Sequence, residues 1–351
     1  MIAVHGGAGL FKEKIEQFCS AALKDDGVEK TGNNMPGSCD EIEVNNQLVK
    51  AIMKLEKCSK FNCGFGSNLT EAGTVECEAA FMCCENLAFG GVASVTNCTH
   101  PIYASYKLAM SHKSSSEENG LIKPIILAGK GANQYCEALN VGIVLNENLR
   151  TEKSNQDRKL AMKRVFNNEQ NEHVSGDSSR LDTTGGIFID ENGYCEAGVS
   201  SGGILLKKEG RLGHSTQFGA AIWAEKRNTT SIAISLSGCG ETLIRTHMAE
   251  ILAEFFLSNN LNDLFLPEKL KNFLEGEPFL KSTRLQTFPV SHLLLGGIAA
   301  VQSNKDNKTT LYAFHSSAHF PIAFKGSDQK IRKFNSKNEK IGNFVCNSFI
   351  L

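Results

Sequence analysis

The first half of the chain combines short apolar runs with one stretch of helical periodicity. Between residues 40 and 57 apolar side chains recur every three or four positions, and Ser38 or Asp40 is placed to cap the helix that this predicts. Shorter apolar runs are typical of buried strands, and the first of them leads directly into the Gly-rich residues 5–9. The strands predicted in this half span residues 2–4, 74–82 and 124–128.

The second half is richer in strand patterns. A β-hairpin is predicted over residues 187–199, because two apolar runs flank the turn residues 190–193. A helix is predicted to open at Gly240, where apolar side chains begin to recur at helical spacing. Further strands are predicted over residues 231–236, 293–301 and 311–315. Strands at both ends of each half, with helices between them, favour a sandwich of sheets with helices outside over a series of βαβ units.

Residues 151–182 differ in composition from the rest of the chain. Twelve of these 32 residues are charged and one is aromatic, which predicts a solvated, flexible linker. The linker ends abruptly at Thr183, where a buried strand is predicted to begin. The chain has no internal repeat, so we expect a single domain over residues 1–351.

Charge and composition exclude several classes of function. The 351 residues include 37 Lys and Arg against 38 Asp and Glu, and 41% are hydrophobic, which is typical of a globular protein with a sizeable core. Neither half is basic enough for nucleic-acid binding, and no apolar run reaches the length of a membrane span. We therefore expect neither nucleic acid nor membrane among its partners.

The cysteines and histidines give no metal signal. No signal peptide is visible, so we expect a cytoplasmic or nuclear protein whose 12 cysteines are reduced. There is no pair of C-x-x-C units, and His315 and His319 flank a stretch that is more typical of strand and turn than of a metal site. We expect neither a metal nor a cofactor.

The junction after the linker carries the strongest chemical signal. If the bond between Asp182 and Thr183 is cut, Thr183 becomes an N-terminal residue with both a hydroxyl and a free α-amine. The amine, whose pKa is roughly 7.7–8.0, can take the hydroxyl proton at neutral pH, so the residue supplies nucleophile and base together. Taken alone, the segment is also typical of an ordinary loop-to-strand junction.

Three later clusters favour the catalytic interpretation. Ser201 precedes two glycines, which let the backbone approach a ligand closely. Arg211 lies in an apolar, Gly-rich neighbourhood that gives a guanidinium little structural purpose. Ser237 and Gly238 stand between a predicted strand and a predicted helix, where free backbone N–H groups can hold an anion. Each cluster alone is typical of a turn, but their order after an Asp-Thr junction is specific.

With these motifs the chain resembles the plant-type asparaginase and isoaspartyl peptidase family of N-terminal-nucleophile hydrolases, and within it most closely the threonine aspartase (taspase) branch. The resemblance implies an αββα sandwich, made as a precursor that cleaves itself into residues 1–182 and 183–351, which stay together and pair as a dimer of heterodimers. The motifs that carry it are His5-Gly6-Gly7-Ala8-Gly9, Asn62 to Leu69, Asp182-Thr183, Ser201-Gly202-Gly203, Gly210-Arg211-Leu212-Gly213 and Ser237 to Glu241.

The resemblance also implies catalytic roles. Thr183 matches the nucleophile, Ser201 stands beside it and supports its amine or hydroxyl, and Asn62 helps position the scissile region. Ser237 and Gly238 match the oxyanion hole, which stabilises the charge that develops only in the tetrahedral intermediate.

Substrate binding is implied in the same way. Arg211 matches the arginine that grips the substrate carboxylate, and Gly9 is expected to contact the substrate as well. In the taspase branch the second carboxylate-binding group is a lysine after the first Gly motif, and Lys12 and Lys14 are both candidates. Asparaginase-like members place an acid for the substrate amine where this chain has His214.

Other departures from the family concern acidic positions. Asparaginase-like members have glycine before the nucleophile, where this chain has Asp182. The family's aspartates after the Gly-rich turn correspond to Glu78 and roughly to Cys84 or Glu85.

These features predict a self-processing threonine endopeptidase that cuts exposed protein segments after an aspartate preceded by an aliphatic residue. The alternative is an asparaginase or isoaspartyl dipeptidase. A catalytically silent binding partner of the same fold is the third possibility.

Overall fold

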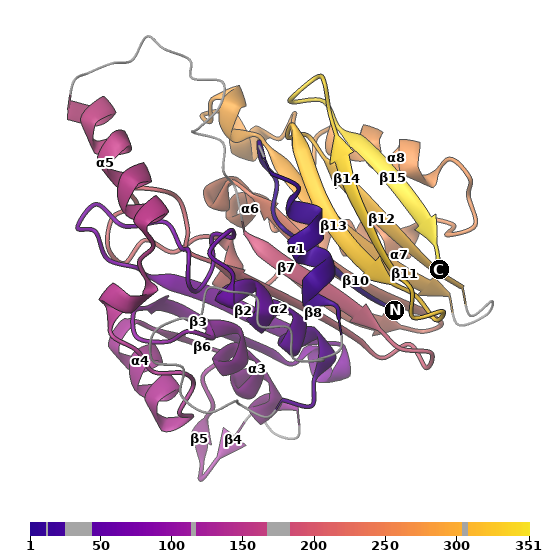
Figure 1. The fold of residues 1–351 in the computed structure, drawn as a ribbon. Coiled ribbons are helices and arrows are strands. Elements are labelled where there is room, and N and C mark those ends of the chain that lie inside the picture. The colour runs from indigo at the N-terminus through magenta and orange to yellow at the C-terminus, as the bar shows by residue number, and fades with distance from the viewer. Residues whose placement is uncertain (12, 25–43, 114–116, 167–182, 304–307) are drawn as a thin grey trace.

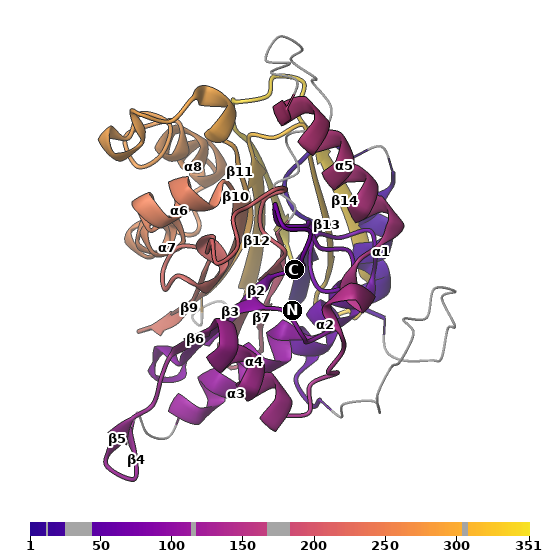
Figure 2. The ribbon, with the colours of Figure 1, turned by 90° about the vertical axis from the view of Figure 1, so that its left-hand side faces the viewer.

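Two β-sheets lie face to face at the centre of the protein, and helices cover the outer side of each (Figure 1, Figure 2). This computed structural model describes residues 1–11, 13–24, 44–113, 117–166, 183–303 and 308–351. Contacts between β10 and both β7 and β8 join the two sheets, so the layers follow one another as helix, sheet, sheet and helix. The αββα fold class expected from the sequence is confirmed.

The larger sheet has eight strands and carries the N-terminal strand near its middle. In spatial order the strands are β14 (Ile331–Lys337), β13 (His319–Lys325), β1 (Ile2–His5), β7 (Thr184–Ile189), β8 (Cys195–Ser201), β2 (Cys77–Cys83), β3 (Phe89–Val95) and β6 (Ile126–Ala128). The pairs are antiparallel except β3 with β6. Because β1 pairs with β13 and β7, both halves of the chain contribute to one sheet.

The smaller sheet has five antiparallel strands, in the order β15 (Val345–Ile350), β12 (Lys308–His315), β11 (Leu295–Ser303), β10 (Thr230–Gly238) and β9 (Ile222–Arg227). Its outer helices are α6 (Gly240–Thr246), α7 (Met248–Ser258) and α8 (Leu266–Leu274). The larger sheet is covered by α1 (Ile15–Ala22), α2 (Gln47–Lys57), α3 (Pro101–His112) and α4 (Gly129–Ala138), with a small hairpin of β4 (Glu117–Glu118) and β5 (Leu121–Ile122) at one end. None of the described helices combines the length and the apolar character needed to cross a membrane.

Alternation along the strands divides the interior into two cores. In β1, Ala3 belongs to the core between the sheets, whereas Ile2 and Val4 belong to the core beneath α1 and α2. In β2, Met82 belongs to the core between the sheets and Phe81 to the core beneath the helices. Because both faces of the larger sheet are buried, its strands read in the sequence as continuous apolar runs rather than alternating ones.

The expected strands are found as β1, β2, β6, β7, β8, β10, β11 and β12, with ends that differ by up to three residues. The helix expected over residues 40–57 begins only at Gln47, and the expected caps Ser38 and Asp40 lie outside the described residues. Its cap is Asn46, whose side chain accepts a hydrogen bond of 2.9 Å from the first turn.

The flexible linker expected over residues 151–182 is wrong in its first half, which forms helix α5 (Glu152–Phe166). Thr151 and Ser154 cap this helix, because the backbone N–H of each donates to the hydroxyl of the other over 3.0 Å. Arg158 fastens the helix to a neighbouring loop by donating to a carbonyl 3.3 Å away. Residues 167–182 lie outside the described residues.

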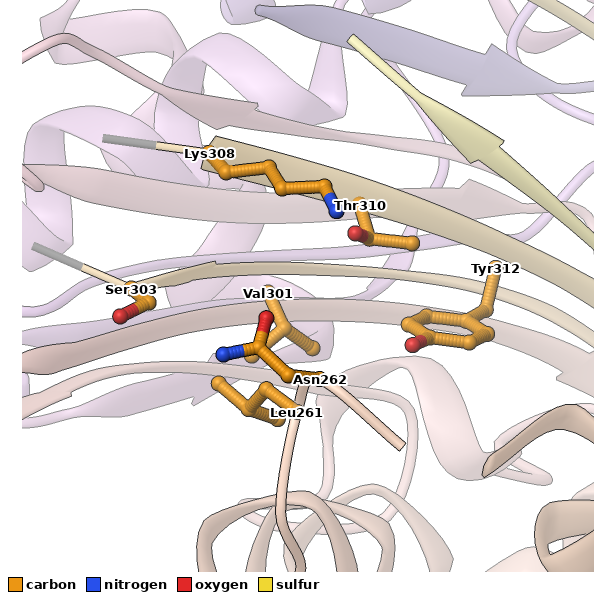
Figure 3. A pocket seen from close by; sticks show the side chains of 7 residues that line it. All are labelled: Leu261, Asn262, Val301, Ser303, Lys308, Thr310 and Tyr312. Atoms are coloured by element: carbon orange, nitrogen blue, oxygen red, sulfur yellow. The ribbon is translucent and has the colours of Figure 1, made fainter. Parts of the chain in front are cut away.

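A shallow pocket lies on the outer side of the smaller sheet, between the α7–α8 connection and strands β11 and β12 (Figure 3). The described residues of its lining include neither an acid nor a histidine, so among them there is no acid–base pair for hydrolysis. The side chains that line it are Leu261, Asn262, Val301, Ser303, Lys308, Thr310 and Tyr312.

Acid is expected to destabilise the fold through three buried histidines. Burial lowers the pKa of His5 to about 3 and those of His214 and His315 to about 4, against about 6.5 in an unfolded chain. Between pH 6.5 and 4 the unfolded chain therefore binds more protons, so the free energy of unfolding falls as the pH is lowered. Each histidine contributes up to about 1.4 kcal/mol per pH unit in that window.

Urea unfolding of the parent and of His315→Gln between pH 7 and 4.5 checks this expectation. The variant removes one of the titrating groups while the carboxyl groups titrate alike in both proteins. Its free energy of unfolding should therefore decline less steeply with falling pH. Equal slopes in the two proteins would show that burial of the histidine does not drive the acid sensitivity.

Candidate active site

The pairing of three strands brings the sequence-predicted site residues to one edge of the larger sheet. Thr184 at the start of β7 pairs with Ser200 near the end of β8, and Ser201 pairs with Glu78 at the start of β2. The last residue of β10, Gly238, reaches the same place from the other sheet. A small pocket forms there, lined by Asn62, Glu78, Thr183, Ser201, Gly203, Ile204, Arg211, His214, Gly238 and Gly240.

Thr183 lies at the inner end of this pocket and is 4% exposed. Its hydroxyl donates to Ser201 Oγ over 3.1 Å, and the backbone N–H of Gly203 donates to the same oxygen over 3.0 Å. Because Ser201 Oγ accepts both bonds, its own proton remains to be donated. The expected neighbourhood of Thr183 and Ser201 is thus present, whereas Asp182 lies outside the described residues.

Asn62 joins the Gly-rich turn after α2 to the segment that follows β8. Its amide nitrogen donates to the Gly203 carbonyl over 2.8 Å, and its carbonyl oxygen accepts from the Asn68 backbone over 2.8 Å. In addition, the backbone N–H of Gly202 donates to the backbone carbonyl of Asn62 over 2.8 Å. Asn62 therefore lines the pocket with both ends of its side chain bound to backbone.

Ser237 and Gly9 lie outside the pocket lining that the described residues form. The Ser237 hydroxyl accepts from the Ala8 backbone N–H over 3.1 Å, so it faces the loop after β1. Gly9 makes a two-way backbone bridge with His319, over 3.1 and 2.8 Å. Gly238, the other expected oxyanion residue, does line the pocket.

Arg211 is bound side-on by an acid that the sequence argument did not single out. Arg211 Nε donates to Glu241 Oε1 over 2.9 Å, and Nη2 donates to Glu241 Oε2 over 2.8 Å. This arrangement uses Nε–H and one Nη2–H. The end of the guanidinium, with the Nη1 hydrogens and the second Nη2 hydrogen, still has the fork geometry that matches a second carboxylate.

Two glycines leave room for this guanidinium. A Cβ atom added at Gly240 would lie 2.7 Å from Arg211 Nη2, and one added at Gly213 would lie 3.0 Å from Nη1. At either position an added Cβ would crowd the guanidinium, which would have to shift from its place beside Glu241. The glycines of the Arg211 motif and of the Gly238 motif therefore have a shared physical purpose, which is to seat the arginine.

Buried charges of both signs surround the pocket. The Glu78 carboxylate accepts from the Gly213 backbone over 3.1 and 3.0 Å and lies 3.9 Å from Arg211 Nη1. Burial raises the pKa of Glu78, while Lys207 and Arg211 oppose that rise. Burial opposes the charge of Arg211, but the hydrogen bonds and charge of Glu241 raise its pKa above the usual value. The guanidinium is therefore charged at any physiological pH.

Lys207 is a buried cation that sequence reasoning missed. Its ammonium donates to the Glu76 carbonyl over 2.7 Å, and a Cβ added at Gly203 would lie 3.0 Å from Nζ. Burial lowers the pKa of Lys207, and Glu78 partly offsets this effect. The available signal was its position between the Ser201 and Arg211 motifs.

His214 lines the pocket where asparaginase-like members have an acid. It is buried, and its ring bonds to the Leu236 carbonyl, while Nε2 has no partner among the described residues. Burial and the nearby Arg211 lower its pKa to about 4, so the ring is neutral at pH 7. A neutral ring cannot balance the charge of an ammonium group.

Several expected residues lie elsewhere. Lys14 is exposed at the start of α1 and is absent from the described pocket lining, and Lys12 lies outside the described residues. Cys84 and Glu85 follow the far end of β2, about 20 Å along the strand from Glu78 at roughly 3.3 Å per residue. The candidates for a second lysine and a second family acid are therefore not part of the described pocket. No cluster of three or more potential metal ligands occurs among the described residues.

Comparison of the sequence with known proteins identifies the family. The sequence profile of the family described as Asparaginase matches residues 1–260. The isoaspartyl peptidase/L-asparaginase of Xenopus laevis is 30% identical over 258 residues, which cover 72% of this chain and 74% of that protein. The isoaspartyl peptidase of Salmonella typhimurium is 28% identical over 263 residues, or 72% of this chain and 77% of that protein.

A probable isoaspartyl peptidase/L-asparaginase 2 of Arabidopsis thaliana is 29% identical over 287 residues, or 74% of this chain and 82% of that protein. The names of these relatives refer to isoaspartyl and asparagine substrates, so membership of the taspase branch stays a prediction. The family profile covers well over half of the chain. The chain belongs to the asparaginase family of N-terminal-nucleophile hydrolases.

Proposed function

We propose that the chain is a self-activating hydrolase of aspartyl amide bonds, with Thr183 as nucleophile, and that it cuts protein segments after aspartate. The observation that carries the proposal is that the Thr183 hydroxyl and the Arg211 guanidinium line the same small, largely buried pocket. A substrate that satisfies both groups presents a carbonyl to Thr183 and a carboxylate to the free end of Arg211.

Aspartyl substrates of two kinds meet this requirement. In an α-aspartyl residue, two carbons separate the backbone carbonyl from the side-chain carboxylate. In a β-aspartyl residue or in asparagine the same two carbons separate the same two groups, but a free amine stands beside the carboxylate. The protein side chain that lies beside the bound substrate carboxylate therefore determines which of the two kinds of substrate is preferred. His214 is neutral and buried there, which favours the α-aspartyl substrate.

The residue before the aspartate is expected to be aliphatic. Among the described lining residues, Ile204 is the one with a large apolar side chain, and it is 41% exposed. The chain's own junction places Leu181 before Asp182. A self-cleaving enzyme must fit its own junction into the site that later receives substrates, so a similar residue should suit other substrates.

Isoaspartyl peptidase or asparaginase activity is the second candidate, and two observations favour it. The relatives are named for those activities. In addition, both Glu78 oxygens bond to a single N–H donor in the described structure, so this pocket-lining carboxylate retains capacity to accept from a substrate ammonium.

Self-cleavage is expected at the bond before Thr183. The freshly expressed chain should separate under denaturing conditions into residues 1–182 and 183–351, as intact-mass spectrometry will show. Thr183→Ala should remain whole, because it lacks the hydroxyl that attacks the preceding carbonyl. Thr183→Ser should split more slowly, since it loses the methyl that restricts the rotamer. A Thr183→Ala chain that still splits at this bond would contradict the proposal that Thr183 is the nucleophile of self-cleavage.

The carboxylate grip is expected to depend on the Arg211–Glu241 pair. Arg211→Lys should lower kcat/KM for an aspartyl peptide by about 10- to 100-fold, because a charged, two-pronged hydrogen bond is worth roughly 1.5–3 kcal/mol. Glu241→Gln should raise KM more than it lowers kcat, since the guanidinium loses the charge that orients it. Steady-state kinetics on the mature enzyme provide both values.

The exposed pair of Arg227 and Glu254, joined at 2.6 Å, offers a matched control. Arg227→Lys makes the same chemical change on the surface and should leave kcat/KM within about twofold. Equal effects at Arg211 and Arg227 would contradict a role for Arg211 in substrate binding.

Substrate choice is expected to separate the two candidates. Peptides containing Leu-Asp-Gly should be cut after aspartate faster than β-aspartyl dipeptides or free asparagine, because His214 supplies no charge for their ammonium. Product analysis by mass spectrometry and an ammonia assay measure the three reactions. Faster release of ammonia from asparagine, or of free aspartate from β-aspartyl dipeptides, would favour the second candidate, and loss of that activity in Glu78→Gln would then identify the ammonium ligand.

A further inference from the structure

The end of β1 lies beside the start of β7, the strand that directly follows Thr183. His5 is the last residue of β1 and is fully buried, with Gly185 of β7 as its partner on one side and Ile322 of β13 on the other. Gly185 is two residues beyond Thr183. His5 is therefore a direct neighbour of the segment that delivers the nucleophile, although it does not line the described pocket.

The His5 ring bonds to the other sheet. Its Nε2 atom lies 2.8 Å from Ser235 Oγ on β10, and that hydroxyl donates onward to the Gly198 carbonyl on β8 over 3.4 Å. The donor and acceptor roles in this bond follow the His5 tautomer; with the Ser235 proton directed to Gly198, His5 Nε2–H donates to Ser235. His5 Nδ1 then holds a lone pair, and it has no partner among the described residues. The side chain thus makes one directed bond, from the larger sheet to the smaller.

This bond passes directly over the nucleophile strand. A Cβ atom added at Gly185 would lie 2.3 Å from Ser235 Oγ and 2.8 Å from His5 Nε2, so no side chain fits between β7 and the bond. A second hydrogen bond joins the loop after β1 to β10, because the Ala8 backbone N–H donates to Ser237 Oγ over 3.1 Å. Ser237 immediately precedes Gly238, which lines the pocket.

We propose that His5 is a positioning residue for hydrolysis. Through Ser235 it sets the spacing between β7, which directly follows Thr183, and β10, which ends at Gly238. The inference rests on the proposed function in one respect, which is that Thr183 is the nucleophile. A looser spacing moves the hydroxyl relative to the Gly238 backbone, and misplacement of reacting groups by about 1 Å can cost about 100-fold in rate.

A purely structural role is the competing explanation, and the fold supplies a control for it. The His5 ring stacks on Phe320 at 5.4 Å between centroids, and His315 stacks on the same phenylalanine at 5.9 Å. Both histidines are fully buried, but the His315 ring bonds to Ser317, not to β7 or β10. His315→Phe therefore perturbs the same stack without touching the bond between the sheets.

The test compares His5→Phe, His5→Gln, Ser235→Ala and His315→Phe as full chains. The measurements are the rate of self-cleavage, kcat and KM on a Leu-Asp-Gly peptide, and the thermal midpoint. His5→Phe and Ser235→Ala should each lower kcat by about 10- to 100-fold with KM within about twofold. His5→Gln, whose amide can still donate to Ser235, should recover part of that loss. His315→Phe should lower the thermal midpoint but leave kcat within about threefold.

The outcomes separate this inference from the proposed function. If the parent is active and His5→Phe and Ser235→Ala keep its kcat, or lose no more than His315→Phe does, the positioning role is wrong and the proposed function stands. If His5→Phe does not fold, Ser235→Ala decides the matter alone, because it removes the bond and leaves the ring in place. A parent that neither cleaves itself nor cuts any aspartyl substrate overturns the proposed function and this inference with it.

Discussion

Antiparallel register between β7, β8 and β2 is the constraint on which the site depends. Pairing of Thr184 with Ser200 places Thr183 beside Ser201, and pairing of Ser201 with Glu78 brings an acid to the same edge. A slip of one residue would turn every side chain of a strand to the opposite face. Burial of both faces of the sheet makes such a slip costly, because it would exchange the residues of the two cores. The apolar interior thus holds the polar site in register.

Charges of both signs lie in and beside the pocket before any substrate enters. Arg211 and Lys207 stand against Glu78 and Glu241, all four buried or partly buried in the described structure. Breaking such a set by removal of one member leaves an uncompensated charge, which is strongly destabilising. Under the proposed function, a substrate carboxylate binds the end of the Arg211 guanidinium, and Glu241 fixes the arginine from its Nε side.

Much of this arrangement could be predicted from the sequence, because glycines and polar residues stand where apolar runs end. Thr183, Ser201, Arg211 and Gly238 meet in one pocket as expected. Helix α5 was missed because its residues are charged and exposed, although Thr151 and Ser154 provide a capping signal.

Long-range contacts account for what could not be predicted. The bond between Arg211 and Glu241 spans 30 positions, and that between Lys207 and the Glu76 carbonyl spans 131. No local pattern marks these partners. Glu241 belonged to a recognised motif, yet its function as the arginine's partner follows only from the approach of α6 to the segment after β8.

Trapping the acyl-enzyme tests the central claim most directly. The mature enzyme would be mixed with excess aspartyl peptide, quenched in acid within one turnover, digested and analysed by mass spectrometry. The account predicts that the fragment beginning at Thr183 gains the mass of the acyl half of the substrate, as an ester on the Thr183 hydroxyl. Turnover without any adduct on Thr183, or an adduct on another residue, would contradict it.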